Sequence, residues 1–383
     1  MIQLFMDMYS INIKYKREGR MDMCRNFNNR LIYFVSNKCS QTIGGVQTII
    51  RLIEEALPYQ RFIEIPIIYN KKDLQLDKLP NVEIYSIALN KGEKIKQYLK
   101  LDNDSNELNE IAIVPNSRII VFGVQKLALL SKKDLMNNEV IIFQSNRPDV
   151  TFGTLESDKI PFILEDKIKY IDKFLFYTEE DKKEILRIMD NSNVEYNFKS
   201  YIVPNPSKTP RKQICKYTNN VMYMGRFDII QKNIKEYVKL ADRIYPKYNI
   251  NAYGDGISKL LLELSKVNVE GVIRDISEVA HRNSILLLLS NYEGFGNVLV
   301  EAYSVGMPVI VYDSYPAAKS IVTPNAGKLI PYGDIDGVID AIDEILKDEE
   351  TFKRYSDGAF EESKKYVKED IVNRYVDVIL DEI

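Results

Sequence analysis

Two glutamates flank a glycine-containing turn in the second half of the chain. Glu293 and Glu301 are eight positions apart in the stretch Asn-Tyr-Glu-Gly-Phe-Gly-Asn-Val-Leu-Val-Glu, and an apolar run over 285–289 precedes it. That run predicts a buried strand of a parallel sheet, and a helix is predicted from residue 298. Glu293 would lie in the loop and Glu301 about one turn inside the helix, so the two could hold different parts of one ligand. The free backbone amides at the helix start would attract an anion.

A pair of basic residues occupies another loop. Arg226 and Lys232 are six positions apart, between a predicted strand that begins at Val221 and a helix predicted from Ile234. Two fixed cations at a site shielded from water would bind an anionic group and stabilise negative charge that develops on it, without a metal ion. Solvated loop cations are the alternative interpretation.

Short apolar runs alternate with helical stretches in two blocks, and this pattern determines which elements position these residues. We predict strands near 31–36, 63–69, 82–87, 119–122, 140–145, 173–177 and 201–203, then near 221–226, 249–253, 267–273, 285–290, 309–313 and 325–331. Helices are predicted over 46–57, 178–189, 298–305, 335–346 and 362–383. The alternation predicts an α/β protein with two doubly wound Rossmann-like domains. A polar, proline-containing stretch over 207–218 separates the blocks, which places the domains at 1–205 and 206–361.

The signature Glu293-x7-Glu301, with Gly294-Phe295-Gly296 inside it, resembles the donor site of retaining glycosyltransferases of the family 4 type. Their architecture, called GT-B, has two Rossmann-like domains facing across a cleft. The resemblance covers residues 31–383 and is strongest over 221–336. It implies that Glu293, Arg226 and Lys232 are catalytic, with Glu293 on the donor sugar and the basic pair on the diphosphate. It also implies that Glu301 holds the ribose, and that the last helix, about 362–383, crosses back to complete the first domain.

Further substrate-binding residues follow from the same resemblance. Gly44 and Gly45 would lie near the donor phosphates, although a tight strand-to-helix turn explains them equally well. Gly254 would lie beside the donor, and Ile273 near the nucleobase, mostly through backbone. The resemblance also assigns the turn itself to substrate binding: Gly294, Phe295, Gly296, Asn297 and Val298.

The sequence departs from the family pattern after the strand at 140–145. The family commonly has a histidine there, near the reacting sugar, whereas the only histidine of this chain is His281 in the second block. Arg147 and Asp149 could take its place as substrate-binding residues, or they could be ordinary loop residues beside Pro148. For His281 itself, a structural or solvated role is favoured.

Composition excludes several classes of protein. With 383 residues, 45% apolar and 28% charged, the chain has the composition of a globular protein, and its net charge of −3 argues against general nucleic-acid binding. Cys24, Cys39 and Cys215 are far apart and suggest a reducing compartment. No apolar run reaches the roughly 20 residues that span a bilayer, so a cytoplasmic protein is expected. Peripheral contact with the inner membrane face or with a partner transferase stays compatible with this.

No metal or other cofactor is expected. The Asp-x-Asp at Asp102 and Asp104 resembles a metal motif of a different glycosyltransferase architecture, but its polar surroundings favour a solvated loop. Residues 1–29 have no clear periodicity and are assigned no function.

The resemblance predicts a metal-independent retaining glycosyltransferase. It would move a hexose or N-acetylhexosamine from a nucleotide-diphosphate sugar, with a UDP-sugar favoured, to a hydroxyl of a glycan, lipid, teichoic acid or protein. By analogy, bacterial members build surface glycans. A catalytically silent subunit that binds a partner enzyme or glycan is the first alternative, supported by the missing histidine. A dehydrogenase-type enzyme acting on nucleotide sugars would need a Gly-x-Gly-x-x-Gly turn, which Gly44 and Gly45 do not supply.

Overall fold

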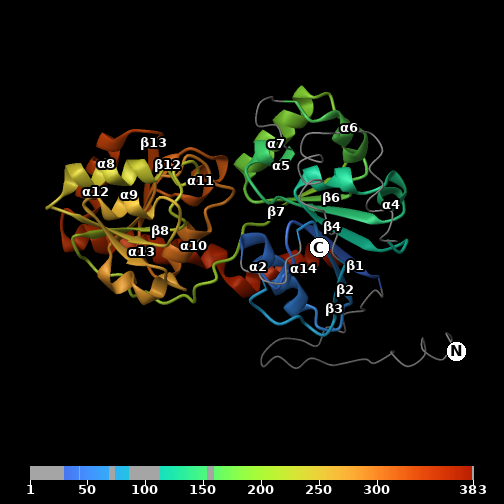
Figure 1. The fold of residues 1–383 in the computed structure, drawn as a ribbon, viewed down its shortest axis with the longest axis horizontal. Coiled ribbons are helices and arrows are strands. Elements are labelled where there is room, and N and C mark those ends of the chain that lie inside the picture. Colours follow the sequence, from blue (N-terminus) through green and yellow to red (C-terminus); the bar gives the residue numbers. More distant parts are fainter. Residues whose placement is uncertain (1–29, 43, 69–73, 86–112, 153–158, 382–383) are drawn as a thin grey trace. The chain divides into compact units, whose positions relative to one another are not determined.

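The computed structural model describes residues 30–42, 44–68, 74–85, 113–152 and 159–381. Contacts within the chain separate residues 1–30 from one unit formed by residues 31–383. All helices and strands described below belong to this second unit (Figure 1). The Asp102 and Asp104 motif and residues 1–29 lie outside the described residues.

The first sheet of the described residues has seven parallel strands in the order β3-β2-β1-β4-β5-β6-β7. Their bounds are Ile32–Ser36 (β1), Phe62–Pro66 (β2), Val82–Ile84 (β3), Arg118–Phe122 (β4), Glu139–Phe143 (β5), Lys173–Phe176 (β6) and Lys199–Ile202 (β7). The order turns back at β1, as in doubly wound folds, where ligands bind beyond the carboxyl ends of the strands.

The second sheet has six described strands, also parallel, in the order β10-β9-β8-β11-β12-β13. Their bounds are Asn220–Met224 (β8), Asn249–Tyr253 (β9), Val267–Gly271 (β10), Ile285–Leu288 (β11), Val309–Asp313 (β12) and Gly327–Pro331 (β13). The chain passes from the first sheet to the second between Ile202 and Asn220. Two parallel sheets with helices confirm the predicted α/β class and its two Rossmann-like domains.

Helices connect the parallel strands. In the first block they are α2 (Gly45–Ala56), η3 (Val124–Leu129), α4 (Lys132–Met136), α5 (Pro148–Phe152), α6 (Phe162–Ile168) and α7 (Glu179–Asn191). In the second they are α8 (Ile234–Ile244), α9 (Lys259–Glu263), η4 (Ile276–Glu278), η5 (Ala280–Arg282), α10 (Asn297–Ser304), α11 (Pro316–Ile321), α12 (Ile335–Ile345), α13 (Glu349–Glu362), η6 (Ser363–Tyr366) and α14 (Lys368–Leu380). A side chain caps the start of α7, since the Thr178 hydroxyl accepts from the backbone N–H of Asp181 at 3.1 Å.

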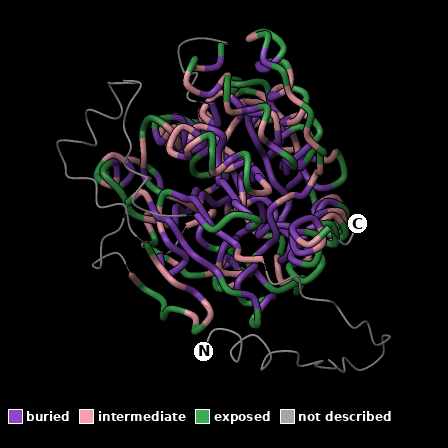
Figure 2. The backbone as a smooth tube through the Cα atoms, turned by 90° about the vertical axis from the view of Figure 1, so that its right-hand side faces the viewer, coloured by how far each residue is buried: buried purple, intermediate pink, exposed green. Residues whose placement is uncertain are grey.

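Each sheet is covered by apolar contacts on both faces. In β1, Tyr33 and Val35 belong to one buried cluster and Ile32 and Phe34 to another, because successive side chains of a strand point to opposite faces. Figure 2 shows the buried residues running along the interior of the structure. Burial on both faces explains why these strands are continuous apolar runs in the sequence.

The end of the chain differs from its prediction. A single helix is predicted over 362–383, whereas α13 ends at Glu362, a 3-10 turn follows, and α14 begins at Lys368. The interruption is at Val367, whose backbone is extended (φ −62°, ψ 126°). Tyr366 belongs to a buried cluster of the second sheet, whereas Ile371, Tyr375 and later buried residues of α14 belong to a cluster with residues of β1, so the chain crosses between the sheets here. Figure 1 shows α14, in red, beside α2, in blue.

Candidate functional site

The turn before α10 is built around a glycine with a positive φ. Gly296 is the N-cap of α10 and has φ +86°, a left-handed conformation that side chains disfavour. A Cβ added there would lie 2.7 Å from the hydroxyl of Tyr315, so space also requires glycine. This conformation lets the chain leave β11 and start α10, and the N-cap residue makes no side-chain hydrogen bond to the first turn.

Three predicted catalytic residues lie together beyond the carboxyl ends of β8 and β11. Lys232 Nζ is 2.5 Å from Oε1 of Glu293, and the Ser290 hydroxyl donates to the same oxygen at 2.7 Å. Arg226 Nη2 donates to Oε1 of Gln231 at 2.6 Å, and the Gln231 amide donates to the second oxygen of Glu293 at 3.4 Å. Glu293 is buried, so this carboxylate is held by cationic and neutral donors rather than by bulk water.

Glycines also fix the loop that carries Arg226. Gly254 has φ +152°, and a Cβ there would lie 1.9 Å from the carbonyl oxygen of Gly225. The backbone N–H of Gly225 donates to Tyr253 O at 3.0 Å, and the N–H of Phe227 donates to Asp255 O at 2.9 Å. Because Gly254 has no side chain, the loop that carries Arg226 can pack against the end of β9.

Glu301 is buried farther along α10. Burial raises the pKa of its carboxyl to about 7, against the lowering effect of the nearby Lys208 ammonium. Lys208 Nζ is 3.6 Å from Glu301 Oε2. The sequence did not indicate this lysine as a site residue, because it belongs to the polar stretch predicted as a domain boundary. The positive charge of Lys208 is the one sign that the sequence offers, because its partner Glu301 lies far along the chain.

Two residues of the turn point into the interior. The ring of Phe295 packs on Tyr177 and Tyr366, with centroid distances of 5.3 Å and 6.2 Å. Val298 packs partly buried against the same cluster, as does Ile273 after β10. The side chain of Phe295 is therefore part of the core and supports the turn.

The loop after β5 lies against the segment that contains Glu293. A Cβ on Gly294 would be 3.1 Å from the Cα of Asn146. The guanidinium of Arg147 lies over the Tyr292 ring at 4.2 Å from its centroid and pairs with Asp149 at 2.8 Å. The structure thus places Arg147, paired with Asp149, against Tyr292, the residue that precedes Glu293 in the chain.

The N-termini of α2 and α10 also meet. Gly44 is the N-cap of α2, and a Cβ on Gly45 would be 3.3 Å from Nδ2 of Asn297, the first residue of α10. The Asn205 amide donates to Asn297 Oδ1 at 2.9 Å, which fixes that side chain. Two helix N-termini at one place concentrate positive potential and backbone donors.

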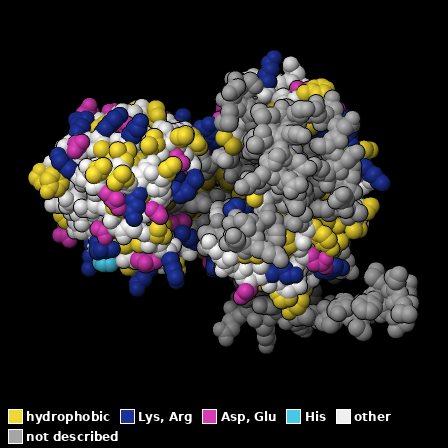
Figure 3. Space-filling model, viewed as in Figure 1, with side chains coloured by type: hydrophobic (Ala, Val, Ile, Leu, Met, Phe, Trp, Pro, Cys, Tyr) yellow, Lys and Arg dark blue, Asp and Glu magenta, His cyan; other side chains and the backbone are white. Residues whose placement is uncertain are grey.

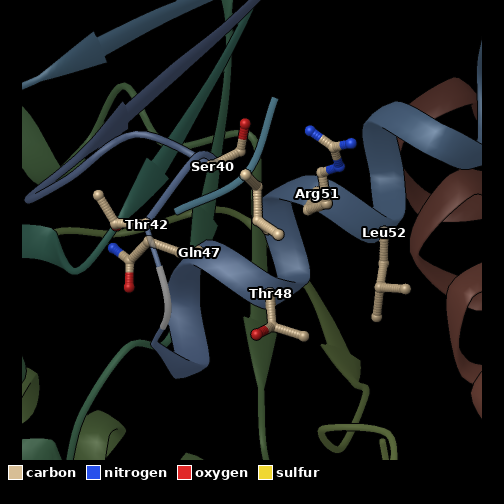
Figure 4. Close-up of a pocket in the computed structure, with 7 residues that line it drawn as sticks. Ser40, Thr42, Gln47, Thr48, Arg51 and Leu52 are labelled. Atoms are coloured by element: carbon tan, nitrogen blue, oxygen red, sulfur yellow. The ribbon is translucent and has the colours of Figure 1, made fainter. Parts of the chain in front are cut away.

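A small hollow of about 110 Å³ lies beside α2 (Figure 4). Its lining residues are Ser40, Thr42, Gln47, Thr48, Arg51, Leu52 and Leu76. Ser40 donates to the buried Glu64 from its backbone N–H at 2.6 Å and from its hydroxyl at 2.8 Å. Burial, and then the nearby Glu64, raises the pKa of Glu54 on α2 to about 8.

Other predicted features lie elsewhere. His281 is exposed in η5, on the surface shown in Figure 3, and η5 precedes β11, at the opposite end of that strand from Glu293. Among the residues that the structure describes, no group of three or more His, Cys, Asp or Glu side chains could hold a metal ion. No helix within the described ranges is long and apolar enough to cross a bilayer.

Comparison with known proteins shows which families and structures this chain resembles. Residues 208–362 match the family model of glycosyl transferases group 1. A protein of the cps region of Klebsiella pneumoniae is 29% identical over 178 residues, which cover 45% of this chain and 49% of that protein. The poly(glycerol-phosphate) alpha-glucosyltransferase of Bacillus subtilis is 24% identical over 213 residues, covering 52% of this chain and 32% of that enzyme. The chain thus aligns with half or less of the length of these relatives.

A solved structure shares the fold over nearly the whole chain. The pneumococcal O-GlcNAc transferase GtfA, solved with UDP and GlcNAc, superposes with a TM-score of 0.66 at 11% identity, covering 92% of this chain and 99% of that one. The family match, which covers residues 208–362, and the shared fold agree with the resemblance carried by the sequence motifs: this part of the chain is similar to glycosyl transferases group 1, and the fold is of the GT-B type.

Proposed function

We propose that this protein is a retaining, metal-independent glycosyltransferase that moves a hexose or N-acetylhexosamine from a nucleotide-diphosphate sugar to a hydroxyl. A UDP-sugar is the favoured donor, in keeping with the UDP bound by GtfA. Retention is taken from the family resemblance. The acceptor is a glycan, lipid, teichoic acid or protein, and the setting is bacterial surface-glycan synthesis. The relatives from the cps region and from glycerol-phosphate polymer glucosylation support this setting.

One observation carries the proposal: Arg226, Lys232 and Glu293 form a single hydrogen-bonded group, next in the chain to the N-terminus of α10. Breaking the bond between sugar and diphosphate leaves negative charge on the diphosphate. Two side-chain cations and a helix N-terminus stabilise that charge as it develops. These groups supply what a bound cation supplies in other transferases, so no metal is assigned to the step.

The two glutamates have different tasks. Glu293 accepts hydrogen bonds from hydroxyls of the donor sugar and so orients the ring. Glu301, deeper on α10, accepts from the ribose hydroxyls. The N-termini of α2 and α10 add backbone donors to the diphosphate from both sheets. Arg147 and Asp149, beside Tyr292, take the place of the family's histidine as hydrogen-bonding groups near the sugar.

The experiment is a panel of donors. UDP-glucose, UDP-galactose, UDP-N-acetylglucosamine and GDP-mannose are each incubated with the protein in EDTA, and released nucleoside diphosphate is measured without an added acceptor. We expect slow hydrolysis of one UDP-sugar, together with a rise in melting temperature on adding UDP. The anomeric configuration of a transfer product then tests retention. Absence of both binding and hydrolysis across the panel would contradict the proposal.

The silent subunit is the second candidate, favoured by the missing histidine. It predicts nucleotide binding without hydrolysis or transfer, so the same panel separates the two functions.

A further inference from the structure

The segment between the two sheets is hydrogen-bonded to α10, η6 and the start of η4 on the two sides of Lys208. Ser207 donates its backbone N–H to Tyr366 O at 2.9 Å, and its hydroxyl accepts from Ser304 on α10 at 2.8 Å. Thr209 donates its hydroxyl to Oδ2 of Asp275 at 2.9 Å. Because both neighbours are fixed, the backbone of Lys208 is fixed as well, and the direction of its side chain is restricted.

Lys208 reaches from this segment to two parts of the proposed nucleotide site. Its ammonium lies 3.6 Å from Oε2 of Glu301 and donates to the carbonyl of Arg274 at 3.4 Å. The side chain of Glu301 is 8% exposed, whereas that of Lys208 is 47% exposed. The lysine thus brings a solvated positive charge to the edge of a buried carboxyl group.

Glu301 needs that charge in order to act as an acceptor. Burial favours the protonated carboxyl, and the pKa of Glu301 is raised to about 7, with Asp275 adding to the rise and Lys208 opposing it. When the carboxyl is protonated, one of its oxygens carries a hydrogen and acts as a donor. The group then no longer accepts through both oxygens from two neighbouring hydroxyls. Near neutral pH, the charges around Glu301 therefore decide whether its carboxyl can accept hydrogen bonds from two neighbouring hydroxyls.

We propose that Lys208 is a positioning residue for nucleotide binding, whose ammonium keeps Glu301 an anionic acceptor for the two ribose hydroxyls of a nucleoside diphosphate. This inference rests on the proposed function. Lys208 acts through Glu301, and its contact with Arg274 O links the carboxylate to the loop assigned to the nucleobase.

The test is the pH dependence of UDP, GDP and ADP binding, measured by calorimetry between about pH 5.5 and 8.5. We expect Lys208→Met to bind about tenfold more weakly than the unaltered protein at the acid end. Near the alkaline end, where Glu301 ionises unaided, the two should differ by less than about threefold. Lys208→Arg should restore the original profile. The terminal phosphate of the ligand titrates equally for every variant, so the ratio of Kd values at each pH isolates the group on the protein.

Two further variants separate this role from a structural one. In a Glu301→Gln background, Lys208→Met should have no added effect, because the group through which it acts no longer titrates. Lys239→Met is the matched control: it removes a lysine paired at 2.8 Å with the buried Glu236 on α8, and its profile should match the unaltered protein.

A loss of affinity that is equal at all pH values would overturn the inference, since it would mean direct contact of Lys208 with the ligand. An unchanged affinity would overturn it as well. In both cases the proposed function would stand, because the unaltered chain binds. Failure of the unaltered chain to bind any of the three diphosphates would overturn the proposed function and this inference together.

Discussion

Lys232 Nζ lies 2.5 Å from Oε1 of Glu293, so the cation proposed to hold the diphosphate is paired with the carboxylate proposed to hold the sugar. Both side chains are largely buried, with 15% and 8% exposure. A donor that binds here must exchange part of this ion pair for its own phosphate and hydroxyl oxygens. The pair therefore holds both side chains in place and competes with the ligand.

The first prediction concerns this pair. Lys232→Met and Glu293→Gln should each lower donor turnover at least about 100-fold, because each removes a group that acts on developing charge or ring orientation. The fold should persist in both. Lys232→Met should also lower the free energy of unfolding by about 1–3 kcal/mol, since a buried carboxylate loses its partner. Turnover with the best donor and urea unfolding measure these effects, and near-normal turnover of both variants would contradict the assigned roles.

The second prediction concerns Gln231, whose side-chain amide connects Arg226 to Glu293. Gln231→Met keeps the length of the side chain and removes both hydrogen bonds, so Arg226 loses its fixed direction. We expect kcat to fall about tenfold with little change in KM, because a misplaced cation stabilises the leaving diphosphate less well.

A double-mutant cycle tests whether Gln231 acts through Arg226. Combined with Arg226→Met, the Gln231→Met change should cost almost nothing more. Gln213→Met is the control, since that amide donates to Ser356 and Asp357 on α13. Additive losses in the cycle would refute the proposed link.

The third prediction compares two glycines with positive φ. Gly254→Ala puts a Cβ 1.9 Å from Gly225 O, so the loop that carries Arg226 must move. We expect a loss of at least about 2 kcal/mol in the free energy of unfolding together with a loss of transfer. Gly333→Ala, at φ +83° with no atom within 4 Å of the added Cβ, should cost only about 1 kcal/mol and leave transfer intact. Equal effects of the two changes would show that close packing at Gly254 is unimportant.

The family resemblance of the two motifs implies that Lys232 and Glu293 share one donor site. The apolar runs and loop positions agree with this, because both residues follow strands of one parallel sheet, whose carboxyl ends lie at one edge. Neither the apolar runs nor the loop positions predict that Gln231 is hydrogen-bonded to both Arg226 and Glu293, because those contacts depend on how two loops pack. The position of Lys208 is likewise set by tertiary contacts on both sides of it, and a polar segment with a proline gives no sign of them.

The same limit explains the break before α14. Residues 362–383 have helical periodicity throughout, so local pattern predicts one helix. The interruption at Val367 is set by packing, because Tyr366 belongs to the core of the second sheet and Ile371 to that of the first. Tertiary contacts decide where a helix ends when local propensity continues through the position.

Hydrophobic periodicity also does not predict that two acidic residues of the first block are buried. Glu54 lies on α2 and Glu64 on β2, and both are fully buried. Burial raises the pKa of both carboxyls, and for Glu54 the neighbouring Glu64 raises it further, to about 8. Ser40 and Arg51 oppose these rises, by hydrogen bonding and by charge respectively. One proton retained by the two acids avoids a doubly charged buried site.

This retained proton makes stability fall as the pH rises. Between the ordinary value of 4.5 and about 8, folded Glu54 holds a proton that the unfolded chain has lost, so the free energy of unfolding declines across that window and levels off above it. Glu54→Gln removes this titration and should be more stable than the unaltered protein at about pH 8.5, by roughly 2 kcal/mol, with little difference near pH 5. Urea unfolding at both pH values measures this. Glu55→Gln, at the exposed neighbour that pairs with Arg51 at 2.8 Å, should leave the pH dependence unchanged. Parallel pH profiles for Glu54→Gln and the unaltered chain would show that Glu54 is ionised in the fold.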